Sequence, residues 1–210
     1  MKEDILEQLV DDYLKVKGFF TVHNVKFRPL SSHPDYLKKE DRVHSDIDVI
    51  GINPRLDGPD RVWVVGCKSW QIGFGPRERI AAIEGNKIRE GREAWRSFRE
   101  LVRPKWGNAL ILEIERLTGS AVFTYVTAVT KLIGDASIWE NHEPFRENLR
   151  GNPIKILTLQ RMLSEMYKKS NTTVASSDVG RLLQVIKASG WKPEPAMLVQ
   201  RKSKSPKSPA

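Results

Sequence analysis

The chain has 210 residues and a formal net charge of +9, with 40% apolar residues, one cysteine and four histidines. This length and apolar content are sufficient for a sizeable core, and one domain is expected over residues 1–191. A single cysteine excludes an internal disulfide and a thiolate zinc cluster, and the histidines lack metal-ligand spacing. Any bound metal should therefore be held by oxygen atoms.

Charge and hydropathy favour a cytoplasmic protein with no membrane partner. No run of about 18 uncharged apolar residues occurs, and the opening residues MKEDILEQLV begin an acidic amphipathic pattern instead of a signal peptide. The segment 192–210 carries five basic residues and one acid, and its Pro, Ser and Lys content is typical of a disordered tail. A charge of +5 remains for residues 1–191, which favours a polyanionic partner such as nucleic acid.

The first part of the chain is expected to form one helix and three strands. Apolar residues at spacings of three and four predict a helix over residues 2–17. Alternation predicts a strand over 19–27, and a polar loop follows from Ser31. Residues 46–52 and 62–67 are strand candidates rich in β-branched residues. The segment NPRLDGPD between them supplies turn residues, so these two strands should form a hairpin.

A long helix is expected over residues 77–103, ending at Pro104. Its predicted core-facing stripe is apolar except for one acid, Glu84. A second stripe with the same spacing would form a ridge of guanidinium groups beside the buried face, made of Arg89, Arg92, Arg96, Arg99 and Arg103. This ridge could follow the phosphates of a nucleic acid, or it could be a solvated face paired with nearby glutamates.

The remaining elements alternate between helix and strand. Periodicity and turn residues predict helices over 106–117, 161–169 and 178–188, a short helix within 135–151, and strands over 121–130 and 154–157.

This order of elements, with acids at the start of the second strand and a lysine at the end of the third, resembles the PD-(D/E)XK nuclease superfamily. That group contains restriction endonucleases, Holliday-junction resolvases and Mrr-like enzymes. Asp48 in SDIDVIGI matches the family's metal-binding aspartate, Lys68 in GCKSW its lysine, and Gln71 a glutamine often found after it. The resemblance covers residues 1–130. It implies an α/β restriction-endonuclease-like core, αβββαβ, with a mixed central sheet flanked by helices and followed here by C-terminal helices.

Phosphodiester hydrolysis explains these residue types, because it needs an activated water and a means to carry the extra negative charge of the transition state. One or two Mg²⁺ (or Mn²⁺) ions held by carboxylates provide both. Asp46 and Asp48 have the same parity on a strand, so both side chains can point to one face, which Lys68 can approach from the neighbouring strand. The resemblance implies Asp48 and the backbone carbonyl of Cys67 as metal ligands. It implies Lys68 as the group that orients water or stabilises charge, with Gln71 and Asp46 assisting.

Gly66 occupies the position, two residues before the lysine, where the family has an acid. Three accounts are open: a substitution has silenced an active enzyme, the acid has moved elsewhere, or the chain binds DNA without cutting it. Glu84 is the best candidate for a displaced acid, because a carboxylate on an apolar stripe is costly unless paired or metal-bound; a structural ion pair is its alternative role. Glu7, on the first helix, resembles an extra acid of some family members, or belongs to a solvated helix face.

We therefore expect a Mg²⁺-dependent DNA endonuclease that is inactivated or weakened by Gly66. Cleavage of both strands would favour a homodimer. The alternative is a non-catalytic DNA-binding or assembly subunit that kept the nuclease-like fold, and an RNA substrate is not excluded by charge or motif.

Overall fold

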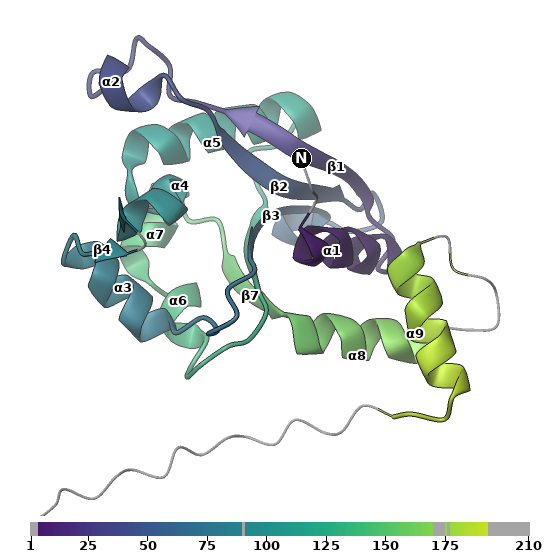
Figure 1. Cartoon of the computed structure of the whole chain (residues 1–210). Coiled ribbons are helices and arrows are strands. Elements are labelled where there is room, and N and C mark those ends of the chain that lie inside the picture. Colours follow the sequence, from purple (N-terminus) through teal and green to yellow (C-terminus); the bar gives the residue numbers. More distant parts are fainter. Residues whose placement is uncertain (1–3, 90, 170–174, 176, 193–210) are drawn as a thin grey trace, which may run out of the picture.

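A computed structural model describes residues 4–89, 91–169, 175 and 177–192. At its centre is a five-stranded sheet in the order β1-β2-β3-β6-β7 (Figure 1). The strands are β1 (Phe20–Phe27), β2 (Ser45–Ile52), β3 (Val62–Lys68), β6 (Thr124–Val129) and β7 (Ile154–Thr158). β1, β2 and β3 pair antiparallel, whereas β3, β6 and β7 pair parallel. The expected α/β class with a mixed sheet is thus confirmed.

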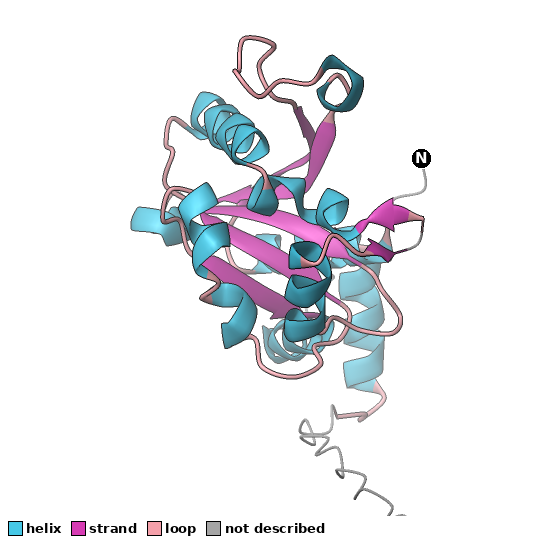
Figure 2. Ribbon diagram, turned by 90° about the vertical axis from the view of Figure 1, so that its left-hand side faces the viewer, coloured by secondary structure: helices cyan, strands magenta, loops and turns pink. Residues whose placement is uncertain are grey.

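Helices cover both faces of this sheet (Figure 2). One face carries α1 (Ile5–Val16), α8 (Leu159–Lys169) and α9 (Asp178–Ala188). The other face carries α3 (Pro76–Glu84), α4 (Arg99–Val102), α5 (Pro104–Thr118), α6 (Ser137–Glu140) and α7 (Glu143–Asn148). The short α2 (Lys38–Asp41) lies between β1 and β2, and 3-10 turns occur at η1 (Gly58–Arg61) and η2 (Ala94–Phe98). No helix in the described ranges is long and apolar enough to cross a membrane.

Two hydrophobic clusters lie on opposite faces of the sheet, because successive side chains of a strand point to opposite sides. Val65 and Val126 pack in the cluster under α1 and α8. Their neighbours Val64 and Tyr125 pack in the larger cluster under the other helices. The two faces of the sheet are therefore covered by separate hydrophobic layers.

Most predicted elements are confirmed with small boundary shifts, including the hairpin of β2 and β3 and the helices α1, α5, α8 and α9. The helix expected within 135–151 is divided into α6 and α7. The tail expected from residue 192 falls outside the described residues, apart from Lys192 itself.

The helix expected over residues 77–103 is wrong. α3 ends at Glu84, and β4 (Ile88–Arg89) and β5 (Arg92–Glu93) then form a separate two-stranded hairpin before η2 and α4. The chain turns at Asn86 and Gly91, whose φ angles of 46° and 73° are incompatible with a right-handed helix. Spacings of three and four persisted in the sequence across this break, so periodicity alone did not reveal it.

A cluster around Glu165 joins α1 to α8. The carboxylate accepts hydrogen bonds from the Tyr13 hydroxyl (2.9 Å), Lys17 Nζ (3.1 Å) and Arg161 Nε (2.9 Å). Burial opposes the charge of Glu165, but the bonds from Arg161, Tyr13 and Lys17 outweigh it and lower the pKa of this carboxyl to about 2. The cluster therefore fastens two helices that cover one face of the sheet.

We predict that Glu165→Gln lowers the free energy of unfolding at neutral pH by about 2 kcal/mol. A lowered folded-state pKa stabilises the fold only where the carboxyl is ionised, so this contribution is complete above the ordinary pKa of 4.5 and disappears as the pH falls toward 2. Urea unfolding curves of the two proteins should converge in acid. Glu113→Gln, which removes a surface pair with Arg116, is the control and should change little at any pH. A Glu165→Gln difference that stays constant with pH would contradict the prediction.

Candidate active site

The pocket of interest forms where β2 and β3 separate. Their ladder runs only from the Val49–Val65 pair to the Ile52–Val62 pair. Beyond it, residues 45–47 stay paired with β1, whereas residues 66–68 pair with β6. The Asp48 carboxylate spans the gap, since its Oδ2 accepts a hydrogen bond from the Cys67 N–H at 2.5 Å. One side-chain bond thus replaces a ladder bond at the opening.

The separated strand ends border a pocket of about 930 Å³. Five of the predicted site residues line it from the sheet: Asp46, Asp48, Gly66, Cys67 and Lys68. Other segments add Lys39, Glu40, Arg92, Arg96, Arg99 and Glu100. The structure therefore brings the acidic pair, the glycine and the lysine of the sequence motif into one cavity, with basic side chains around them.

The local conformation of β2 determines how its two aspartates are presented. Opposite Asp48, Asn24 of β1 has a left-handed conformation with φ 53°, and the β1–β2 ladder omits this position. Ile47 and Ile50 both face the larger hydrophobic cluster, so strict alternation fails between them. Asp46 is exposed at the edge of the pocket, whereas Asp48 is half-buried inside it.

The environment of Asp48 disfavours its negative charge. Burial raises the pKa of Asp48 most, and the charges of Asp46 and Glu100 act in the same direction. The Cys67 N–H and the Lys68 ammonium act in the opposite direction without cancelling the rise. A cation entering the pocket would relieve this repulsion between carboxylates.

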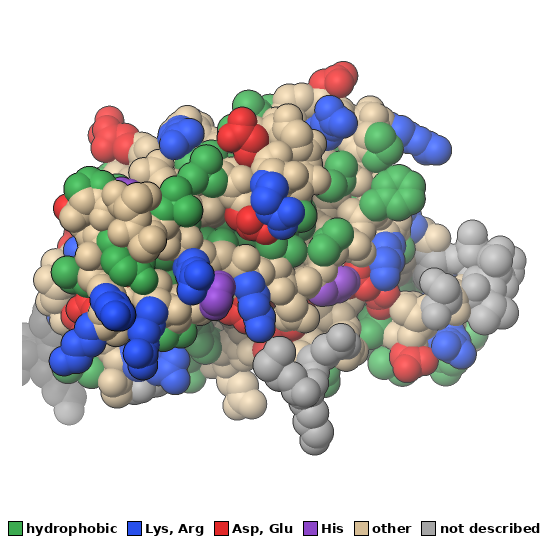
Figure 3. All heavy atoms as spheres, turned by 90° about the horizontal axis from the view of Figure 1, so that it is seen from above, with side chains coloured by type: hydrophobic (Ala, Val, Ile, Leu, Met, Phe, Trp, Pro, Cys, Tyr) green, Lys and Arg blue, Asp and Glu red, His purple; other side chains and the backbone are tan. Residues whose placement is uncertain are grey.

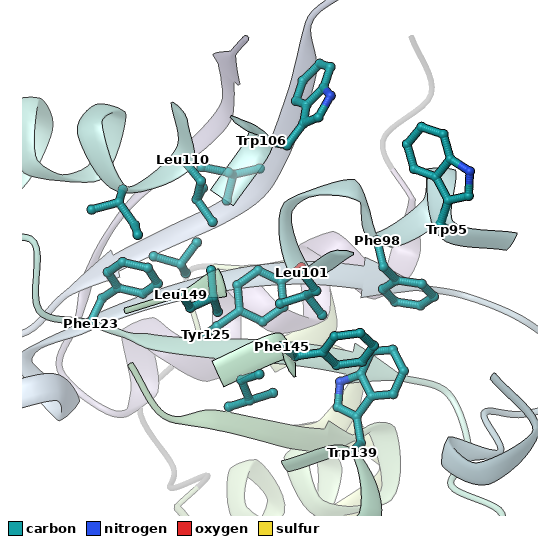
Figure 4. Packing of buried hydrophobic residues seen from close by; sticks show 14 of the residues in the cluster. Trp95, Phe98, Leu101, Trp106, Leu110, Phe123, Tyr125, Trp139, Phe145 and Leu149 are labelled. Carbon is teal, nitrogen blue, oxygen red and sulfur yellow. The ribbon is translucent and has the colours of Figure 1, made fainter. Parts of the chain in front are cut away.

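Lys68 lies against an aromatic surface on the pocket side of the sheet. Its Nζ is 5.4 Å from the centroid of the Phe98 ring. Phe98 packs in turn against Trp139, with ring centroids 4.8 Å apart, in the cluster that Figure 4 shows. The Lys68 ammonium thus lies beside an aromatic ring, and the lysine lines the pocket that contains Asp48.

Glu100 and Tyr125 are pocket residues that the sequence did not reveal. Tyr125, on β6, is only 3% exposed, and its hydroxyl donates a hydrogen bond to Glu100 Oε1. Burial, followed by the charge and hydrogen bond of Glu100, raises the pKa of Tyr125 well above its usual value, so the phenol stays a donor. A Cβ built on Gly66 would lie 3.1 Å from this hydroxyl oxygen. The absent side chain at Gly66 and the Tyr125–Glu100 pair therefore occupy adjoining space.

The sequence contained a signal for part of this arrangement. Asn86 and Gly91 are turn-forming residues inside the stretch predicted as one helix. They lie between Glu84 on α3 and Glu100 on α4. The contact from Tyr125 to Glu100 joins β6 to α4, and no local pattern in the sequence predicts it.

The five arginines do not form a helical ridge, because their segment is divided into several elements. Three of them nevertheless line the pocket: Arg92, Arg96 and Arg99. Arg96 is ion-paired with Glu93 at 2.8 Å, and the Arg99 guanidinium lies 4.6 Å over the Trp106 ring. Arg89 is exposed on β4, and Arg103 lies over the Trp95 ring outside the pocket.

Three further candidate residues lie outside the pocket. Glu84 ends α3 with its side chain 62% exposed, and its Oε1 is 3.3 Å from His142 Nε2. Gln71 is exposed in the turn after β3, and Glu7 is half-buried on α1, on the other side of the sheet. The apolar stripe that made Glu84 a candidate does not exist.

Oxygen atoms are the metal-binding groups that the pocket offers. In the part of the chain that the structure describes, no group of three or more His, Cys, Asp or Glu side chains is arranged to hold a metal ion. The Asp48 and Glu100 carboxylates line the same pocket, and the charge of Glu100 contributes to the raised pKa of Asp48. Cys67 contacts Asp48 through its N–H, and its thiol, whose pKa burial raises, is not a candidate ligand.

No protein-family model, curated protein or solved structure matches this chain.

A double-mutant cycle tests the fit between Gly66 and Tyr125. Gly66→Ala should destabilise the protein by about 1 kcal/mol, because the new methyl group crowds the Tyr125 hydroxyl. In a Tyr125→Phe background, the same change should be neutral or stabilising by about 0.5 kcal/mol through the loss of unfolded-state entropy. Urea unfolding of the four proteins measures the coupling. Equal effects of Gly66→Ala in both backgrounds would contradict the contact.

Proposed function

We propose that the protein is a metal-dependent nuclease that hydrolyses phosphodiester bonds in DNA, with a restriction-endonuclease-like core of the PD-(D/E)XK type. One observation carries the proposal: Asp48 and Lys68, from strands that separate at this point, line one pocket together with basic side chains. The order α1, β1, β2, β3, helices, β6 is consistent with the core that the motif implies. The lysine and arginine side chains that line the pocket suit a substrate with negative charge on every repeating unit.

The donor atoms in the pocket suit Mg²⁺. This ion prefers oxygen ligands and is commonly held by one or two carboxylates, with water and substrate phosphate completing the coordination. Asp48 and Glu100 would be the carboxylates, and the carbonyl of Cys67 a further oxygen. A set of only two acids is consistent with an ion that is partly held by the substrate. When bound, Mg²⁺ supplies positive charge to the phosphate and makes a water molecule more acidic.

The chain's own groups have separate tasks in this proposal. Lys68 donates a hydrogen bond to a non-bridging phosphate oxygen and carries part of the negative charge that develops there. Asp46, exposed in the pocket lining, would accept a proton from the attacking water. Arg96 and Arg99 bind phosphate oxygens beside the reacting group.

Glu100 supplies the acid that Gly66 lacks. The Tyr125 hydroxyl orients Glu100 and fills the space into which a side chain at position 66 would begin. The glycine is thus matched to its surroundings, and this favours a displaced acid over a silenced site. The displaced acid is Glu100 on α4, in place of the Glu84 expected from the sequence.

Nicking of supercoiled plasmid DNA with Mg²⁺ or Mn²⁺ tests the catalytic assignment. Asp48→Asn, Glu100→Gln and Lys68→Met should each lower the rate roughly 100-fold or more, because each removes a group that stabilises charge in the transition state. Glu84→Gln is the matched control, since it removes an acid outside the pocket. A wild-type protein that binds DNA but does not nick it would favour the non-catalytic DNA-binding alternative.

The substitution Gly66→Glu separates the displaced-acid account from the silenced-enzyme account. We expect no gain in nicking, because the new side chain would collide with the Tyr125 hydroxyl and disturb Glu100. The silenced-enzyme account expects a clear gain. The same assay decides between them, with Gly66→Ala as the control for the effect of a Cβ alone.

A further inference from the structure

Two segments that carry exposed cations border the pocket. The first, here named the α2 arm, comprises residues 28–44 between β1 and β2, and it contributes Lys39 and Val43 to the pocket lining. The second is the hairpin of β4 and β5, which contributes Arg92. Both project from the same side of the molecule (Figures 1 and 2).

The α2 arm is fastened to α5 by one buried carboxylate. Asp41 is 1% exposed, and it accepts hydrogen bonds from Lys105 Nζ (2.6 Å), Trp106 Nε1 (3.2 Å) and the Leu37 N–H (2.7 Å). Burial opposes the charge of Asp41, but the bonds from Lys105 and Leu37 outweigh it and hold its pKa below the usual value. The arm is therefore held at a fixed place beside the pocket.

In and directly after α2, the arm carries exposed cations beside the exposed acid Glu40. Lys38, Lys39 and Arg42 are exposed, and none of them has an ion-pair partner among the described residues. Figure 3 shows Lys and Arg side chains gathered over the end of the molecule that carries α2. Because the arm is anchored through Asp41, Lys39 is held in the pocket lining, and Lys38 and Arg42 lie close to it in the sequence.

The β4–β5 hairpin carries an unfavourable pair of like charges. Arg89 and Arg92 are directly opposite each other in its short ladder, an arrangement that destabilises a strand pair by about 0.2–1 kcal/mol. The base of the hairpin is nevertheless anchored: the Ala94 N–H donates to the Lys87 carbonyl at 2.9 Å, and Trp95 is buried just after it. An anion bridging the two guanidinium groups would remove the repulsion, and Arg92 reaches the pocket itself.

Resting on the proposed function, we infer that the α2 arm and the β4–β5 hairpin, together called the two arms, bind backbone phosphates on opposite sides of the bond that is cut. The DNA strand runs continuously through the pocket, from the α2 arm to the β4–β5 hairpin, with Asp48 and Lys68 between them. The substrate class is therefore nucleic acid with backbone on both flanks of the scissile phosphate, and no free end is required. Solvated lysines alone would not explain why two anchored segments, distant in sequence, bring cations to the same pocket.

The first experiment measures DNA binding with Ca²⁺ replacing Mg²⁺, so that cleavage does not interfere. Lys38→Gln/Lys39→Gln/Arg42→Gln and, separately, Arg89→Gln/Arg92→Gln should each weaken binding of a fluorescent duplex roughly tenfold or more. Each should also reduce the slope of log affinity against log salt concentration by about 0.9 for every phosphate that is no longer neutralised. Arg181→Gln/Lys187→Gln on α9, which packs on the other face of the sheet, is the charge-matched control for the hairpin variant and should change little. Unchanged affinity in either arm variant, or an equal loss in the control, overturns the inference.

The second experiment compares a covalently closed DNA minicircle with its linear form under the same conditions. Equal affinity for the two, with the same losses in both arm variants, is the expected result. Binding of the minicircle at least roughly tenfold weaker would mean that the pocket needs an end, and it would overturn the inference. Since neither experiment depends on turnover, a protein that passes both but never nicks DNA would refute only the proposed nuclease function.

Discussion

The separation of β2 and β3 beyond the Val49–Val65 pair is the constraint on which the site depends. A continuous ladder would leave no cavity at this end of the sheet. The Asp48 carboxylate keeps the strands in a defined relation by accepting the Cys67 N–H in place of a backbone carbonyl. The same residue is thus a structural brace and, in our proposal, a metal ligand. Its raised pKa reflects burial among other acids, the condition that a cation relieves.

The space beside Gly66 is occupied by residues far away in the sequence. Tyr125 reaches from β6 into the space beside it and holds Glu100, which α4 carries to the pocket. A pocket with one carboxylate from a strand and one from a helix can supply the same two charges as a pocket with both on strands. The chemistry of metal binding requires oxygen atoms at suitable places and does not require a particular element to carry them.

The sequence was sufficient for the sheet and for the motif on it. Alternation and β-branched residues predict β1, β2 and β3, and Asp46, Asp48 and Lys68 line one pocket although strict alternation fails in β2 between Ile47 and Ile50. The prediction of one helix over residues 77–103 is wrong because a period near 3.6 can continue by chance across a turn. The turn-forming residues Asn86 and Gly91 are the signal against this helix, and the apolar spacing around them hides it. Glu84 is a candidate only on that incorrect helix. No local pattern in the sequence indicates Glu100, because its role depends on a tertiary contact with Tyr125.

The central claim, that the pocket holds a divalent cation between Asp48 and Glu100 beside a DNA phosphate, is tested most directly by anomalous diffraction. Crystals of the protein with a short DNA and Mn²⁺ would locate the ion by its own scattering. The account predicts a Mn²⁺ ion in contact with carboxylate oxygens of both residues and with a phosphate oxygen of the DNA. Mn²⁺ bound elsewhere, or DNA lying away from this pocket, would contradict it.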